Sequence, residues 1–154
     1  MPPDLIDSIL GITAGSPLGT LRRRRPEALR HAEGAHRELL LPEEPGGLSL
    51  ALRAALALRV AQREGEAALA AHYQALLEAA GGVAAGDARL DALLRYADTV
   101  ASAPEATSRA DIDGLVALGL SPRDIVAATQ LIAFVPYQVR VIAGLRALLQ
   151  ETTP

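Results

Sequence analysis

The chain has 154 residues, a formal net charge of −3 and no cysteine, and all of its Lys/Arg positions are arginine. This length suits one domain with a substantial core, and the charge gives no general attraction to nucleic acid or to an acidic membrane. Without lysine there is no Schiff-base enzyme and no GxxxxGK[ST] phosphate loop, and without cysteine there is no disulfide, thiolate metal site or thiol nucleophile.

The composition favours helices throughout. Half of the residues are hydrophobic, but only 3% are aromatic, and alanine and leucine, both strong helix formers, dominate. The residues that strands favour are scarce outside 125–142. We therefore predict an all-α bundle of about seven helices.

The first third of the chain is predicted to form an N-terminal helical arm, residues 1–45. Capping residues, helix-starting prolines and Gly11 delimit three helices, which cover residues 4–10, 16–25 and 26–41. The Pro- and Gly-rich segment 42–47 then breaks the chain. We place there the boundary with a helical core, residues 46–154, within one compact domain overall.

In the core, start and stop signals predict five helices: 49–63, 66–80, 87–100, a short one from Ser108 to Gly119, and a last one from Pro122 toward Leu149. Ser108 and Asp111 form the pattern of a capping box. Pro136 is expected to kink or split the last helix near Val135. The most apolar run, 125–135, is too short to span a bilayer, and no signal peptide is recognised, so we expect a soluble cytoplasmic protein.

Two blocks of sequence together resemble a known family. The first runs from 48 through 61 to His72; the second contains Tyr96-Ala97-Asp98, Gly119-Leu120-Ser121 and Leu131-Ile132-Ala133-Phe134, and closes with Arg140-Val141-x-x-Gly144-Leu145. Over residues 46–148 this order and spacing is similar to the alkylhydroperoxidase D / carboxymuconolactone decarboxylase family, in its peroxidase-related branch. The resemblance implies that family's helical fold and a homo-oligomer, either a trimer or a hexamer built from two trimers.

The family's peroxidase site consists of a Glu, a Cys-x-x-Cys pair and a His four residues later. Alignment on His72 places Gly65 and Ala68 at the cysteine positions and Arg53 at the glutamate position. Peroxide reduction there needs one thiolate to attack and a second thiol to resolve the disulfide. We therefore predict no thiol-dependent peroxidase activity, although the decarboxylase branch of the family also lacks the cysteine pair.

His72 is the first candidate catalytic residue, as a general acid or base near neutral pH. The alternative is a structural histidine with a fixed hydrogen bond. Arg53 could bind a carboxylate or phosphate, or form an ion pair between helices. Tyr137, Gln138 and Arg140 follow Pro136 and could line a pocket or belong to an interface.

Other patterns are weaker. Glu33-x-x-His36 matches half of a di-iron motif, but the chain has no second copy, so we interpret it as an exposed pair. Most of Arg22–Arg25 should be solvated, with one or two pairing with acids. Glu66 fits a first-turn residue that complements the helix dipole. No metal or cofactor is predicted.

Three functions remain open. The chain could be a non-thiol member of the family, which either is catalytically degenerate or binds a small acidic metabolite near His72, Arg53 and Tyr137. It could be a lactone decarboxylase-type enzyme with His72 as acid and base. It could also be a structural partner of itself or of a cysteine-bearing homologue.

Overall fold

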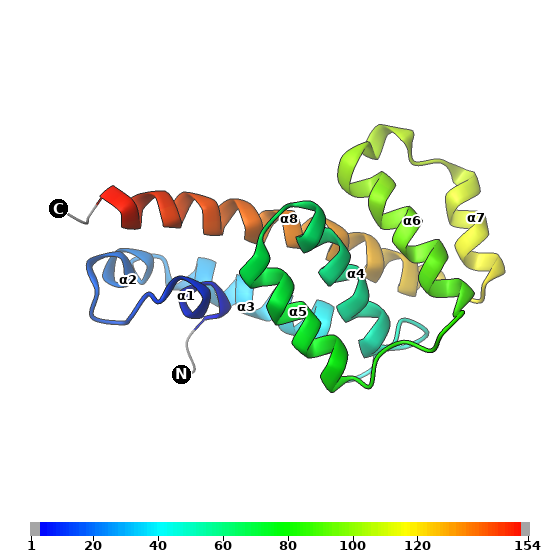
Figure 1. The fold of residues 1–154 in the computed structure, drawn as a ribbon, viewed down its shortest axis with the longest axis horizontal. Coiled ribbons are helices and arrows are strands. Elements are labelled where there is room, and N and C mark those ends of the chain that lie inside the picture. The colour runs from blue at the N-terminus through cyan, green and yellow to red at the C-terminus, as the bar shows by residue number, and fades with distance from the viewer. Residues whose placement is uncertain (1–3, 152–154) are drawn as a thin grey trace.

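The computed structural model describes residues 4–151 of the chain (Figure 1). These residues form no strand, and the predicted all-α fold is confirmed. The elements are α1 (Leu5–Leu10), α2 (Pro17–Arg22), α3 (Pro26–Leu40), α4 (Leu50–Arg63), α5 (Ala67–Ala79), α6 (Ala88–Ser102), a 3-10 turn (Pro104–Ala106), α7 (Arg109–Ala117) and α8 (Pro122–Glu151). The eight α-helices of residues 4–151 correspond one for one to the eight predicted ranges, whereas the overall estimate was about seven.

The helices begin where the sequence predicts because side chains satisfy the free backbone N–H groups of their first turns. The Asp4 carboxylate caps α1, and the Ser49 hydroxyl accepts a hydrogen bond at the start of α4. Ser108 and Asp111 form the expected capping box on α7. α2 ends at Arg22, three residues earlier than predicted, since the residue preceding Pro26 disfavours the helical conformation.

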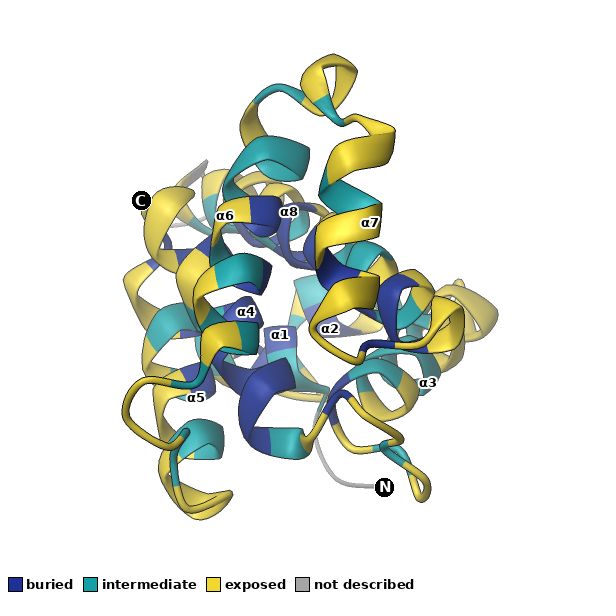
Figure 2. Cartoon of the chain, turned by 90° about the vertical axis from the view of Figure 1, so that its right-hand side faces the viewer, coloured by how far each residue is buried: buried dark blue, intermediate teal, exposed yellow. Residues whose placement is uncertain are grey.

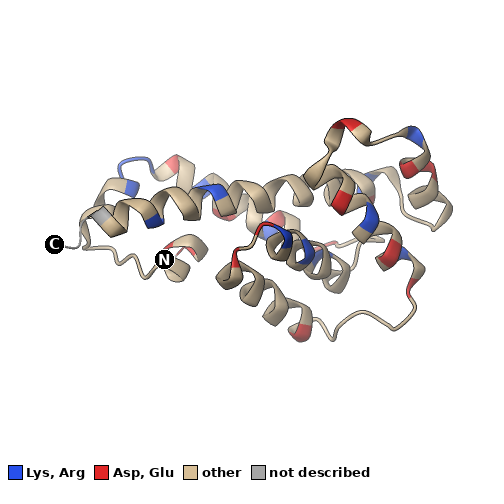
Figure 3. Cartoon of the chain, turned by 45° about the horizontal axis from the view of Figure 1, so that its top comes forward, with Lys and Arg blue, Asp and Glu red and all other residues tan. Residues whose placement is uncertain are grey.

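The centre of the bundle is α4, in which every residue from Ala51 to Ala57 is buried. It packs against α5, α6 and α8, while α1 and α3 from the arm pack against α8. The buried residues of these helices face the interior in Figure 2. Figure 3 shows acidic and basic residues interspersed along the helices in view, as expected for a surface of small net charge.

The last helix corrects one prediction. α8 runs without a break from Pro122 to Glu151 and passes through Pro136 (Figure 1). Proline removes one helical hydrogen bond and opposes the helix locally. Here Val135, Gln138 and Ile142, on the same part of α8, are all buried in the bundle, and their packing offsets that cost. The expected split near Val135 is therefore wrong.

α8 is also the most apolar element. Residues Pro122–Gln150 are long enough to cross a bilayer and have a mean hydropathy of 1.5 in their most apolar stretch, of which 44% is buried in the fold. The whole helix is thus longer than the apolar run considered in the sequence. The buried helix of a globular core has the same length and composition, and contacts with α1, α3, α4, α6 and α7 give the apolar side of α8 a protein partner.

Candidate functional site

The pocket that contains His72 lies between the arm and the core and has a volume of about 530 Å³. Its polar lining comes from both parts of the chain. The arm supplies Asp4, Ser8, Glu33, His36 and Arg37, and the core supplies His72, Tyr137 and Gln138. The structure therefore brings together three of the five site residues predicted from the sequence.

His72 lies against a second histidine. Its Nε2 atom is 3.3 Å from Nε2 of His36, which reaches it from α3. Both side chains are half-buried. Burial lowers the pKa of His72, and burial together with repulsion from His72 lowers the pKa of His36 to about 4. Both imidazoles are therefore neutral at neutral pH, and one can donate its proton to the other.

The ring of Tyr73 packs against both imidazoles. It stacks on His36 with centroids 6.4 Å apart and meets His72 edge-on at 5.3 Å. The hydroxyl donates a buried hydrogen bond to Oε1 of Gln138. Burial raises the pKa of Tyr73, although that hydrogen bond opposes the shift. Tyr73 does not line the pocket itself. It packs against both imidazoles as a neutral hydrogen-bonded group, which sequence reasoning missed.

Tyr137 and Gln138 are neighbours on α8 but occupy different positions. Gln138 is buried, with its amide facing Tyr73. Tyr137 is 45% exposed at the rim, where its ring stacks on Phe134 with centroids 5.8 Å apart. The uninterrupted helix accounts for this arrangement, since successive residues on a helix point about 100° apart.

Arg140 and Arg53, the other two predicted residues, do not line this pocket. Arg140 is exposed on α8. Arg53 is buried and donates hydrogen bonds to three main-chain carbonyl oxygens, those of Leu39, Pro45 and Leu48, over 2.8–3.0 Å. Contrary to the prediction, Arg53 does not lie at the pocket with His72. Its guanidinium instead holds the segment between α3 and α4, residues 41–49, which we call the linker.

Asp124 holds the same linker from the other side. One carboxylate oxygen accepts from the backbone N–H of Gly47 over 3.0 Å, and the other accepts from the backbone and hydroxyl of Ser121 over 2.9 and 2.7 Å. A Cβ atom at Gly47 would lie 2.7 Å from this carboxylate, and one at Gly46 2.8 Å from it. Glycine is therefore required where the linker passes Asp124.

The arm residues of the pocket correct a further interpretation. Glu33 and His36 were read as an exposed pair, but both are half-buried and line the pocket. The signal was their spacing with Leu29 and Leu40, since these four positions follow the i, i+4, i+7, i+11 stripe of an inward helix face. Arg37 follows His36 and also lines the pocket.

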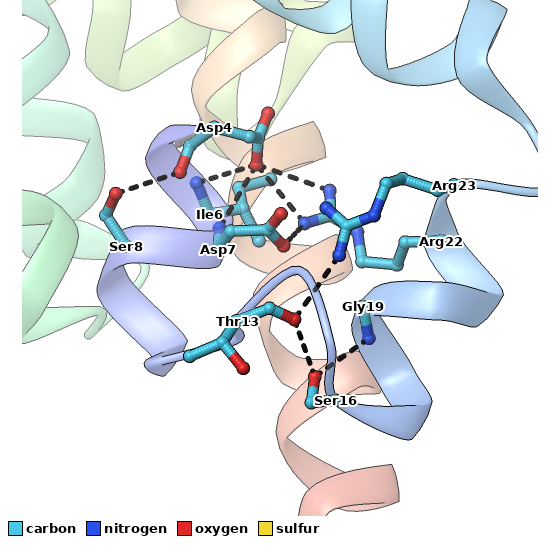
Figure 4. A network of polar contacts seen from close by, with 9 residues as sticks. All are labelled: Asp4, Ile6, Asp7, Ser8, Thr13, Ser16, Gly19, Arg22 and Arg23. Carbon is cyan, nitrogen blue, oxygen red and sulfur yellow. Dashed lines mark hydrogen bonds and ion pairs between the residues drawn. The ribbon is translucent and has the colours of Figure 1, made fainter. Parts of the chain in front are cut away.

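Two arginines, Arg22 and Arg146, form ion pairs that hold the surrounding helices. Arg22 contacts the carboxylates of Asp4 and Asp7, and thereby ties α2 to α1 (Figure 4). The Asp4 charge in the pocket wall is thus compensated. Glu66 is buried and accepts two hydrogen bonds of 2.9 Å from Arg146. It joins α5 to α8, in addition to preceding the first turn of α5. Within residues 4–151, no group of three or more His, Asp or Glu side chains is placed to hold a metal ion.

Comparison with known proteins supports the fold. No family model matches the chain, and no curated protein is similar to it. Among solved structures, it is similar to the crystal structure of an uncharacterized peroxidase-related protein from Silicibacter sp. TM1040, with a TM-score of 0.59 and 21% identity. The match covers 94% of this chain and 84% of that one. The chain therefore has the all-helical fold of that peroxidase-related protein.

Proposed function

We propose that this protein is a cysteine-less member of the alkylhydroperoxidase D-like group that lacks thiol peroxidase activity and binds a small acidic molecule. The fold it shares with a peroxidase-related protein supports the grouping. The absence of any thiol supports the loss of peroxidase chemistry. The homo-oligomer, the absence of nucleic-acid and membrane partners and the cytoplasmic location expected from the sequence belong to the same proposal.

The observation that carries the binding proposal is the pocket between α3, α5 and α8. Its volume of about 530 Å³ falls in the range of roughly 300–1,000 Å³ that is usual for small-molecule sites. Phe134 and Tyr137 provide an aromatic wall, and the neutral His36–His72 pair provides a hydrogen-bond donor. Arg37 is the basic side chain of the lining, so it replaces Arg53 and Arg140 as the group proposed to hold a carboxylate.

We expect Arg37→Gln to weaken the binding of a short-chain carboxylic acid by up to about fivefold, because Arg37 is exposed and also contacts Glu38 over 3.8 Å, and an exposed ion pair contributes up to about 1 kcal/mol. Titration calorimetry with a panel of mono- and dicarboxylic acids measures this. Arg140→Gln is the matched control, since it removes the same charge from an exposed site outside the pocket. Equal losses in the two variants, or no binding by any acid of the panel, would refute the proposal.

A second candidate function is acid–base catalysis of the lactone decarboxylase type. The close His36–His72 contact favours it, because it gives His72 a partner that can orient its imidazole and exchange a proton with it. If this holds, the protein turns over a muconolactone, and His72→Asn lowers kcat at least a hundredfold. His31→Asn, which changes an exposed histidine, leaves kcat unchanged. Turnover that survives in His72→Asn would exclude this role.

A further inference from the structure

The His36–His72 pair can share a hydrogen bond at its observed distance, and the same distance also suits a metal ion. The two Nε2 atoms come from different helices, 36 positions apart in the chain, and face each other at 3.3 Å. A tetrahedral metal ion with nitrogen ligands at about 2.0–2.1 Å separates two of those nitrogens by about 3.3–3.4 Å. The spacing of the pair therefore equals the spacing of two ligands of one ion.

A third ligand is available on the same helix. Glu33 lies one turn before His36 on α3 and lines the same pocket. The carboxylates of di-metal helical bundles use this same Glu-x-x-His spacing. In the structure Glu33 is not yet grouped with the two histidines, and its carboxylate has no ion-pair partner among residues 4–151. For Glu33 to act as a third ligand, rotation about its side-chain bonds would have to bring its carboxylate to the pair.

We infer that His36 and His72 form a binding site for a divalent transition-metal ion, with Glu33 as the side chain that completes it. Two imidazoles and one carboxylate suit Zn²⁺, Co²⁺ or Fe²⁺, whereas Mg²⁺ and Ca²⁺ prefer oxygen ligands alone. All three side chains line the pocket, so a bound ion would lie at its wall. The neutral imidazole is the form that ligates, and it needs only to carry its proton on Nδ1.

This inference concerns the proposed ligand pocket but does not depend on an organic ligand. The metal is therefore titrated alone, into tag-free, chelator-treated, full-length protein. We expect one Zn²⁺ per chain, measured by competition with a chromophoric chelator, and visible absorption bands when Co²⁺ replaces it. His36→Gln and His72→Gln should each weaken Zn²⁺ binding by more than about tenfold, and Glu33→Gln by a smaller factor.

The matched control is His31→Gln, which removes the remaining histidine of the chain from the exposed side of α3 and should leave Zn²⁺ binding unchanged. A second measurement needs no variant: in the unaltered protein, Zn²⁺ should protect His36 and His72, but not His31, from carbethoxylation by diethylpyrocarbonate. Absence of Zn²⁺ binding, equal losses in His31→Gln, or equal protection of all three histidines would overturn the inference. Carboxylate binding that persists without metal affinity would overturn the metal site alone.

Discussion

Replacement of Arg53 by methionine is expected to lower the free energy of unfolding by about 3–5 kcal/mol. The guanidinium is buried and donates to the carbonyl oxygens of Leu39, Pro45 and Leu48. Methionine has a similar length but no donor, so these carbonyls lose a charged partner. Urea unfolding followed by far-UV circular dichroism measures the change.

Arg59→Met is the matched control for this variant. Arg59 lies on the same helix, but it is exposed and its partner is the carboxylate of Asp98 on the surface. Surface ion pairs contribute little to stability, so the loss should be much smaller than for Arg53→Met. Losses of equal size would show that the three carbonyls have other partners in solution and that Arg53 does not hold the linker.

The second large effect is expected for Asp124→Asn, which should cost about 2–3 kcal/mol at neutral pH. Asp124 accepts hydrogen bonds from Gly47 and from Ser121, and thereby joins the linker to the first turn of α8. An asparagine retains one acceptor oxygen and presents an NH₂ group to the remaining donors. The same unfolding experiment, repeated across pH, checks this prediction.

The pH dependence provides a stricter test. Burial raises the pKa of Asp124, but hydrogen bonds from Ser121 and from the backbone of Gly47 and Leu48 outweigh it, so the net pKa is lowered. A carboxyl group with a lowered pKa in the folded state stabilises the protein above its unfolded pKa, and this contribution is lost as pH falls through the folded pKa. The difference between the unaltered protein and Asp124→Asn should therefore be constant near neutral pH and shrink below about pH 4.

Asp113→Asn is the control for Asp124→Asn, because it makes the same chemical change in an exposed pair with Arg109. It should leave the free energy of unfolding essentially unchanged. A difference between Asp124→Asn and the unaltered protein that does not vary down to the acid-unfolding region would contradict the proposed role of the carboxylate.

Local signals in the sequence predicted the helices well, because where a helix begins depends mainly on residues close to that point in the chain. A cap such as Ser49 or the Ser108–Asp111 box satisfies backbone groups within one turn of itself, so a few neighbouring residues contain the whole cause. Pro136 is different. Its local effect opposes the helix, but burial of α8 on both sides of it decides the outcome, and such packing cannot be read from neighbours in the chain.

The sequence predicted only part of the site, because the site also depends on contacts between residues that are distant in the chain. His72, Tyr137 and Gln138 lie in the region that resembles a known family, and the structure places all three at one pocket. Arg53 was assigned to the wrong environment because a charged residue on an apolar helix face does not reveal whether its partner is a ligand or a carbonyl oxygen. Glu33 and His36 were noticed but placed on the surface, because they belong to the arm, where the resemblance does not extend.

The division of the pocket between arm and core has a consequence for how such a protein can diversify. One wall is formed by α1 and α3 and the other by α5 and α8, while Arg53 and Asp124 fix the joint between them without contributing to the lining. Ile6 and Leu40 of the arm belong to the same buried core as α4, so the freedom to vary lies in the arm residues that line the cavity, such as Glu33 and Arg37. If the cavity binds a ligand, substitutions at these positions would change its specificity and leave the core unchanged.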